Sequence, residues 1–451
     1  MREQYKRLLN LVSVVLLMLV ECGLFAWVWY SYYGDNAQYF YGRRGNWVVI
    51  ALYILIMFFF AKTLGGYKVG YLKISEICFA QFVAIVLSNV VEYLQLCIIA
   101  HGYAEPRPIL LLTLVEVLLV VFWAYIVRRI YLALYPPHNM LFIYGERRQQ
   151  ELIDKINTRG DKYNISASIS IQEGMDAICA RMKHYEAVII GDIPSQLRND
   201  LVKYCYANDV RAYITPKISD IIIAGAEEIN LFDTQLLLSR NYGLSGEQLM
   251  IKRMMDIVIS VIGLTILSPF MLLTAICVKC YDGGPVFYTQ ERLTKNRKRF
   301  QILKFRSMRV DSDKASKYLT IKGDDRVTPV GKFIRRIHFD EIPQLINILK
   351  GDMSFVGPRA MWETIIDESE QVVPEFAFRL KVKAGLTGYA QVYGKYNTTP
   401  YDKLKLDLTY IEKYSVWLDI KIILMTVKAV FRSEEGFEAK QQTAAAKEPE
   451  E

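Results

Sequence analysis

The sequence predicts a membrane α-helical bundle of four spans, then an α/β Rossmann-like domain, then a second α/β domain with a re-entrant membrane helix. Three observations predict this fold class. Hydrophobic residues make up 52% of the 451 residues, a high share for a soluble protein. Four long apolar runs precede residue 130. After them, short apolar segments alternate with amphipathic ones, as in a parallel sheet whose strands are joined by helices.

The apolar runs have about the length of transmembrane helices, which need about 20 apolar residues. They lie at Leu8–Tyr30, Trp47–Ala61, Ile77–Ala100 and Ile109–Val127, within a membrane domain at 1–135. The second run is short, so we expect little tilt there. Basic residues flank the runs unevenly, and this bias places both ends of the domain in the cytoplasm. The inner set is Arg2, Lys6, Arg7, Lys62, Lys68, Lys73, Arg128 and Arg129, against Arg43, Arg44 and Arg107 outside.

Polar residues within the spans have a structural interpretation. Glu21, Glu92 and Glu116 fall inside them, and hydrogen bonding between helices or snorkelling to the membrane interface is favoured over a transport pathway. The seven cysteines predict no disulfide framework in a reducing cytosol. Cys277 and Cys280 lie in an apolar stretch without a second pair, so we expect no metal site there.

A different texture begins after Pro136-Pro137, where a domain at 136–245 is expected. Strands are predicted at Met140–Tyr144, Ala187–Ile190 and Val210–Ile214, with a helix at Gln149–Thr158. The first strand-to-helix turn lacks the glycine spacing that cradles a pyrophosphate. We therefore interpret this domain as structural or regulatory.

The third domain, at 246–438, opens with an apolar stretch at 252–280 that Ser268-Pro269 interrupts. Proline removes a helical hydrogen bond, and serine can satisfy the freed backbone group. A helix that enters one leaflet and returns fits best, because a fifth span would move the basic residues at both of its ends apart across the membrane. A kinked full span stays open as the alternative.

A strongly basic segment follows. From Arg292 to Arg309 there are eight basic residues and no acidic one. Such a run attracts phosphate or anionic lipid. No nucleic-acid fold signature accompanies it, so nucleic acid is a poor interpretation.

Asp340 and Glu341 form a carboxylate pair behind Arg335-Arg336, and Pro343 places a helix start near Asp340. Asp340 at such an N-cap stabilises the helix. The same position keeps a carboxylate ionised and attracts phosphate, which suits a nucleophile. The pair alone leaves both interpretations open, and the neighbouring arginines, with Arg359 after Gly357-Pro358, favour phosphoryl transfer.

At this point the sequence resembles the polyprenyl-phosphate hexose-1-phosphate transferases, the long-form members of the monotopic phosphoglycosyl transferase superfamily. The resemblance covers about residues 250–437. Its ordered motifs are Lys252-Arg253 with Asp256, Ser268-Pro269, Gly284-Pro285-Val286-Phe287-Tyr288 with Gln290 and Arg292, Lys304-Phe305-Arg306-Ser307-Met308, Asp340-Glu341-Ile342-Pro343-Gln344, Gly351-Asp352-Met353-Ser354-Phe355-Val356-Gly357-Pro358-Arg359, Gly385-Leu386-Thr387-Gly388 with Ala390-Gln391, and Leu406-Asp407-Leu408 with Tyr410-Ile411-Glu412.

The resemblance implies a phosphotransferase with a cytoplasmic catalytic domain in the bacterial cytoplasmic membrane. Asp340 would attack the β-phosphate of a UDP-sugar, and undecaprenyl phosphate would then accept the sugar phosphate. Glu341 would assist, and Mg²⁺ would bind at Asp340. The phosphate- and substrate-binding residues implied are Arg335, Arg359, Lys304, Arg306, Gln344 and Gln391. Such a reaction is the first membrane step of exopolysaccharide, capsule or O-antigen synthesis.

Two other functions were weighed. A membrane-tethered nucleotide-sugar dehydratase or epimerase needs a glycine-rich turn, which is missing, and a Tyr-x-x-x-Lys pair, which occurs at Tyr318 with Lys322 and at Tyr401 with Lys405. An inactive scaffold for polysaccharide assembly is disfavoured by the intact carboxylate pair. Glucose or galactose is the expected sugar, with N-acetylated sugars left open as the alternative. A homodimer is expected, and the tail at 439–451 is expected to be disordered.

Overall fold

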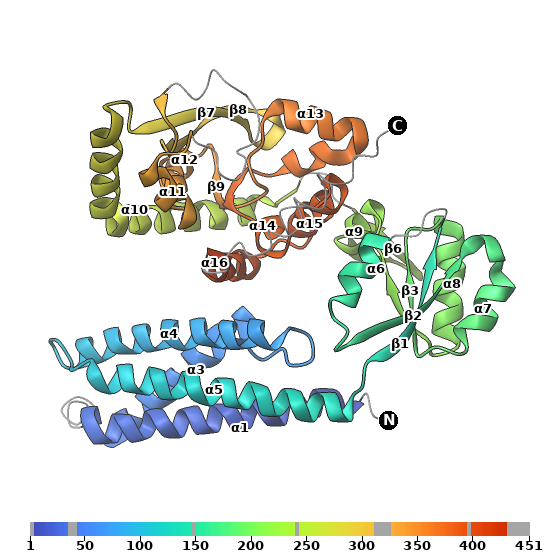
Figure 1. Ribbon diagram of the computed structural model, residues 1–451, viewed down its shortest axis with the longest axis horizontal. Helices are drawn as coiled ribbons and strands as arrows, with labels where there is room; N and C mark the ends of the chain where they lie inside the picture. Colours follow the sequence, from blue (N-terminus) through green and yellow to red (C-terminus); the bar gives the residue numbers. More distant parts are fainter. Residues whose placement is uncertain are drawn as a thin grey trace. The chain divides into compact units, whose positions relative to one another are not determined.

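The computed structural model describes residues 4–34, 43–145, 150–239, 243–310, 326–394 and 398–430. These residues are mostly helical, with small sheets between the helices (Figure 1). They divide into two compact units, Met1–Thr215 and Pro216–Glu451. The predicted tail at 439–451 and the pair Tyr318 with Lys322 lie outside the described residues.

The first unit begins with a bundle of long apolar helices that lie side by side (Figure 1). Each has the length and hydropathy to cross a membrane, as predicted. The second run was predicted to be short, but its helix has 22 residues because it continues through polar residues at both ends. The helices are α1 (Gln4–Val28) with a π-helical extension η1 (Trp29–Tyr33), α3 (Arg43–Leu64), α4 (Ile74–Ile99) and α5 (Arg107–Leu134).

Buried polar groups link the bundle's helices. Glu116 on α5 accepts hydrogen bonds from the hydroxyl of Tyr53 on α3 and, at 2.8 Å, from Nδ2 of Asn89 on α4. The interhelical hydrogen bonding predicted for Glu116 is confirmed. Glu21 and Glu92 are equally buried, but neither carboxylate has a hydrogen-bond partner among the described residues, so the same prediction is wrong for these two.

A four-stranded parallel sheet with strand order β2-β1-β3-β4 completes the first unit. The sheet is buried on both faces: Leu141 and Ile143 of β1 pack in one cluster with Ile178, while Phe142 packs in another with Ile153. The predicted strands are confirmed, and β2 was missed because its sequence is largely polar. The elements are β1 (His138–Tyr144), α6 (Gln150–Asn157), β2 (Tyr163–Ser170), η2 (Ile171–Glu173), α7 (Met175–Met182), β3 (Ala187–Ile190), α8 (Ser195–Ala207) and β4 (Arg211–Ile214).

The second unit combines short helices with three two-stranded sheets. β5–β6 and β7–β8 are antiparallel, and β9–β10 is parallel. The elements are α9 (Ile218–Ala224), β5 (Glu227–Leu231), β6 (Thr234–Leu238), α10 (Gly246–Asp282), β7 (Phe287–Leu293), η3 (Lys295–Arg297), β8 (Arg299–Phe305), α11 (Pro329–Arg336), η5 (Phe339–Glu341), α12 (Gln344–Lys350), β9 (Ser354–Val356), α13 (Glu363–Val372), η6 (Pro374–Lys381), β10 (Gly385–Thr387), α14 (Tyr389–Tyr393), α15 (Pro400–Glu412) and α16 (Val416–Val430).

Helix α10 bends sharply into two arms (Figure 1). Pro269 has no N–H to donate to the carbonyl of Thr265, and the Ser268 hydroxyl donates to that same oxygen at 2.9 Å. The interruption predicted at Ser268-Pro269 is thus a bend within one continuous helix. Most large apolar side chains of α10 are exposed.

Both arms of α10 are attached to the same unit. On the first arm, Asp256 accepts hydrogen bonds from the Ser354 hydroxyl at 3.0 Å and from the Phe355 N–H at 2.8 Å. At the end of the second arm, Asp282 pairs with Arg306. Both ends of α10 therefore contact the rest of the second unit.

Candidate active site

The carboxylate pair lies on a short 3-10 helix between α11 and α12. His338 precedes this helix in the left-handed conformation, with φ 55° and ψ 22°. That conformation is uncommon for a side chain with a Cβ and often marks a functional turn. The prediction that Asp340 caps the following helix is wrong, because His338 reverses the chain first and α12 begins only at Gln344.

Glu341 is held by two cations. Its Oε1 accepts from Nζ of Lys304, on β8, at 2.7 Å and from Nη2 of Arg359, which follows β9, at 2.9 Å. Burial alone would raise the pKa of Glu341, but Arg359 and Lys304 lower it to about 2. Glu341 is therefore ionised at physiological pH, and its charge is used to hold two cations in the site.

Asp340, by contrast, has no hydrogen bond or ion pair among the described residues. Burial and the neighbouring Glu341 charge raise its pKa, while Lys304 and Arg335 oppose that rise. Arg335 is anchored through its Nε, which donates to the Ser307 hydroxyl at 2.8 Å. A carboxylate without a partner, surrounded by cations, is suited to attack an electrophile that carries negative charge.

A further arginine completes this cationic surface. The guanidinium of Arg292 lies 4.0 Å from the ring centre of Trp362 and donates to Oε1 of Gln290 at 2.7 Å. Burial and the nearby Arg359 lower the pKa of Arg292 to about 10, and its buried Nε has no partner among the described residues. From the sequence, Arg292 was assigned to the basic segment and to a family motif, but was not named among the binding residues. The signal was strand alternation, because Arg292 and Lys304 face the same side of the β7–β8 ribbon.

Lys403 on α15 was missed altogether. Burial, with the charges of Arg379 and Arg359, lowers its pKa to about 8. Arg379 in turn pairs with Asp407 at 2.8 Å, both fully buried, and donates to the backbone carbonyl of Arg359 at 3.2 Å. Arg359 is thus positioned from behind by a buried ion pair. Nothing in the local sequence around Lys403 indicated this neighbourhood.

Three predicted binding residues have no hydrogen bond or ion pair with Asp340 or Glu341 among the described residues. Arg306 is tied to Asp282 at the end of α10. Gln344 is buried as the first residue of α12. Gln391 on α14 donates from Nε2 to the Leu386 carbonyl at 3.2 Å, and its buried Oε1 has no partner in the described structure.

The donor set limits the kind of metal site. Within the described ranges, no group of three or more His, Cys, Asp or Glu side chains could hold a metal ion. With Glu341 committed to Lys304 and Arg359, Asp340 is the carboxylate available in the site. Mg²⁺ commonly binds through one or two carboxylates together with substrate phosphates. The residues therefore fit a Mg²⁺ that is bound mainly by a diphosphate and not a preformed metal centre.

Comparison with known proteins finds relatives of the part of the chain that contains these residues. The family model described as bacterial sugar transferase matches residues 247–433, which include all of the site residues above. A "UDP-glucose:undecaprenyl-phosphate glucose-1-phosphate transferase" of Caulobacter vibrioides is 37% identical over 191 residues, covering 41% of this chain and 72% of that protein.

Two longer relatives show similar identity. The "UDP-N-acetylgalactosamine-undecaprenyl-phosphate N-acetylgalactosaminephosphotransferase" of Aeromonas hydrophila is 35% identical, over 54% of this chain and 59% of its own. The "UDP-glucose:undecaprenyl-phosphate glucose-1-phosphate transferase" of Escherichia coli K12 is 39% identical, over 45% of this chain and 43% of its own. The chain thus matches about half the length of these two relatives.

Proposed function

Because the chain belongs to the bacterial sugar transferase family, we propose that it transfers a hexose-1-phosphate from a UDP-sugar to undecaprenyl phosphate. One observation carries the proposal. Asp340 has no partner among the described residues, whereas the adjacent Glu341 is held by Lys304 and Arg359. An available nucleophile beside fixed cations is what attack on a diphosphate requires.

In the proposed first step, a carboxylate oxygen of Asp340 attacks the β-phosphorus of the UDP-sugar. A bond forms between that oxygen and phosphorus, the bond between phosphorus and the bridging oxygen breaks, and UMP leaves. In the second step, a phosphate oxygen of undecaprenyl phosphate attacks the same phosphorus and displaces Asp340. The product is undecaprenyl-diphosphate-sugar, and the carboxylate is regenerated.

The cations have separate parts in this scheme. Arg359 and Lys304, fixed by Glu341, and Arg335, anchored on Ser307, would hold phosphate oxygens as negative charge shifts onto the leaving UMP. Asp340 would also hold Mg²⁺, which when bound neutralises charge on the diphosphate.

The proposed location is the bacterial cytoplasmic membrane, with four spans and the catalytic domain, 246–438, in the cytoplasm. The attachment of both arms of α10 to one unit supports a re-entrant helix, because a straight span would separate Asp256 from Asp282 across the bilayer. The middle domain, 136–245, is proposed to be Rossmann-like. This arrangement brings a soluble UDP-sugar and a lipid phosphate to the same surface.

The donor and the assembly state extend the proposal. Glucose or galactose is favoured, and the relatives' names include both glucose and N-acetylgalactosamine, so the donor panel contains all three sugars. A homodimer is proposed as well, and the hairpin β5–β6 supports it by exposing Leu231, Phe232 and Leu237.

The test is UMP release from UDP-glucose, UDP-galactose and UDP-N-acetylgalactosamine, with Mg²⁺ and undecaprenyl phosphate. Asp340→Asn should reduce lipid-dependent UMP release by at least about 10³-fold, since it removes the nucleophile. Asp367→Asn, a surface carboxylate that pairs with Arg297, is the matched control and should retain activity. UMP release that survives in Asp340→Asn would contradict the mechanism, and no release from any donor would contradict the function.

A further inference from the structure

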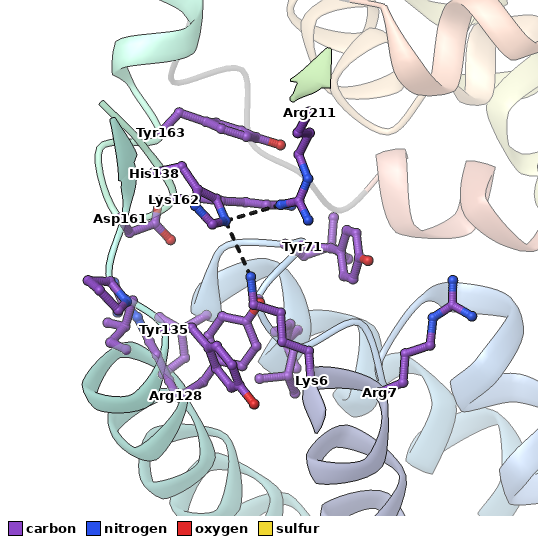
Figure 2. Close-up of a pocket in the computed structure, with 18 of the residues that line it drawn as sticks. Lys6, Arg7, Tyr71, Arg128, Tyr135, His138, Asp161, Lys162, Tyr163 and Arg211 are labelled. Atoms are coloured by element: carbon purple, nitrogen blue, oxygen red, sulfur yellow. Dashed lines mark hydrogen bonds between the residues drawn. The ribbon is translucent and has the colours of Figure 1, made fainter. Parts of the chain in front are cut away.

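The first unit contains a cavity of about 790 Å³ that is separate from the candidate active site. Its lining comes from the start of α1, the connection between α3 and α4, the end of α5, and the first residues of β1, β2 and β4 (Figure 2). The volume is in the range of small-molecule sites. No residue assigned to the proposed transfer reaction lines it.

The charges in this cavity are strongly one-sided. Five cations line it: Lys6, Arg7, Arg128, Lys162 and Arg211. Asp161 is the one carboxylate among its described lining residues, and it is already paired with Arg159 at 2.9 Å. The lining therefore carries a large positive excess in a partly enclosed space, where charges are screened less than on an open surface.

Two of these cations converge on one imidazole. Lys6 Nζ lies 3.3 Å and Arg211 Nη1 lies 3.1 Å from Nε2 of His138, so both contacts end at the same nitrogen (Figure 2). Nδ1 of His138 is 2.7 Å from Glu186, which fixes Nδ1 as the donor and Nε2 as the acceptor. Two like charges so close to one nitrogen repel each other, and an anion would offset that repulsion.

Lys162 experiences the same excess. Its ammonium lies 4.1 Å from the ring centre of Tyr71, and its pKa is lowered by burial and further by Arg159 and Lys6. Five tyrosines share the lining. Tyrosine rings with Lys and Arg are typical of the border between membrane and water, which is the depth of lipid phosphates.

The position of the cavity separates it from the usual nucleotide site of a parallel sheet. Such sites lie at the carboxyl ends of the strands. Here His138, Tyr163 and Arg211 stand at the first residues of β1, β2 and β4, which is the opposite edge. That edge adjoins Lys6 and Arg128 of the membrane helices.

We infer that this cavity is a second ligand site, which binds a phosphate-bearing anion. The phosphate belongs either to an anionic lipid headgroup at the membrane surface or to a soluble diphosphate. Bound there, it joins the segment between α3 and α4 to the sheet, across a boundary where Arg159 already donates to the Tyr71 carbonyl at 2.7 Å. The site thereby makes the middle domain responsive to phosphate at the membrane surface.

The experiment uses the full-length protein in phosphatidylcholine nanodiscs and measures hydrogen exchange in two segments, 67–73 and 161–163. Phosphatidylglycerol doped into the nanodisc and sodium pyrophosphate in solution are the two probes. At least one of the two probes should protect both segments in the unaltered protein. Arg128→Gln and Lys162→Gln should each raise the probe concentration for half-protection by roughly fivefold. Arg129→Gln, the neighbouring arginine absent from the lining, should change it by less than about twofold.

The outcomes separate the sources. Protection by phosphatidylglycerol alone identifies a lipid headgroup, protection by pyrophosphate alone identifies a soluble diphosphate, and protection by both supports the shared chemistry. Absence of protection by either probe overturns the inference, and this arm needs no variant that folds. Equal weakening in Arg129→Gln and Arg128→Gln also overturns it, because binding would then reflect general surface charge.

Discussion

Replacing Glu341 with glutamine should lower the free energy of unfolding by an amount that follows from the lowered pKa of Glu341. The pKa of Glu341 falls from an ordinary 4.5 to about 2 despite burial, because Arg359 and Lys304 hold it. Each pKa unit corresponds to about 1.4 kcal/mol, so the ionised form gains about 3 kcal/mol in the folded state. The Arg359 side chain is 45% exposed, and solvent screening reduces the net loss in Glu341→Gln to about 1–3 kcal/mol.

The pH dependence has a definite sign. The folded-state pKa of Glu341 lies below its unfolded value, so the unfolded chain binds the proton first as the pH falls. The stabilisation is therefore complete above about pH 4.5 and is lost towards pH 2. Glutamine does not titrate. The difference in stability between the unaltered protein and Glu341→Gln should consequently narrow between pH 6 and pH 3.

Thermal unfolding in nanodiscs measures this difference. At about 2–4 °C per kcal/mol, a loss of about 1–3 kcal/mol in Glu341→Gln should lower the Tm at pH 7 by roughly 2–12 °C. Glu363→Gln is the control, since Glu363 pairs with Arg299 at 2.6 Å on the surface, and it should lower the Tm by about 1 °C or less. Equal Tm values for Glu341→Gln and the unaltered protein at pH 7 would refute the stabilising role of the ion pairs that Glu341 makes with Lys304 and Arg359. A difference in Tm that is the same at pH 3 as at pH 7 would also refute it.

Three further predictions concern other parts of the second unit. Lys252→Met should lower the free energy of unfolding by about 3 kcal/mol, because it leaves the buried carboxylate of Asp419 without the ammonium that lies 2.6 Å away. The double variant Lys252→Met with Asp419→Leu should have a higher Tm than Lys252→Met alone, and a lower Tm would contradict this. Burial lowers the pKa of Lys403 to about 8, so this side chain loses its positive charge as the pH passes 8, and the KM for the UDP-sugar should rise. Arginine keeps its charge, so Lys403→Arg should abolish that rise. An identical pH profile in the variant would exclude Lys403 from donor binding. Pro269→Ala restores the missing backbone N–H donor and should straighten α10. A membrane-impermeant thiol reagent added outside spheroplasts should then label Cys280 in this variant and not in the unaltered protein. Equal labelling of the two proteins would contradict the role of the bend.

The sequence predicted the elements whose hydrophobic pattern is local. The membrane helices follow from the length of their apolar runs, and β3 follows from four consecutive buried residues, Ala187–Ile190. Strand β2 escaped because its residues, Tyr163–Ser170, are largely polar and only partly buried. That strand lies at one edge of the sheet and is stabilised by pairing with β1, which no local pattern records.

The sequence singled out several residues that the structure brings together, but not the partners that they contact. Lys304 and Arg359 were expected to hold phosphate, and in the structure both contact Glu341, from positions 37 and 18 residues away in the sequence. Such contacts depend on how the β7–β8 ribbon and the turn after β9 pack around the carboxylate pair Asp340 and Glu341. Arg306 shows the opposite case, since it belongs to the same motif as Lys304 but pairs with Asp282 of α10.

Glu341, which pairs with Lys304 and Arg359, also affects the net charge that the site presents to the proposed substrate. Four cations, Arg292, Lys304, Arg335 and Arg359, surround the two carboxylates Asp340 and Glu341, so four positive charges less two negative leave an excess of two. A nucleotide-sugar diphosphate carries about two negative charges and would neutralise that excess. In the proposed mechanism, once Asp340 has formed its acyl phosphate, the same cations would face a departing UMP with more negative charge. Under this proposal Glu341 would both order the cations and limit how tightly they hold the product, which gives a reason for an acidic residue at the centre of the proposed phosphate site.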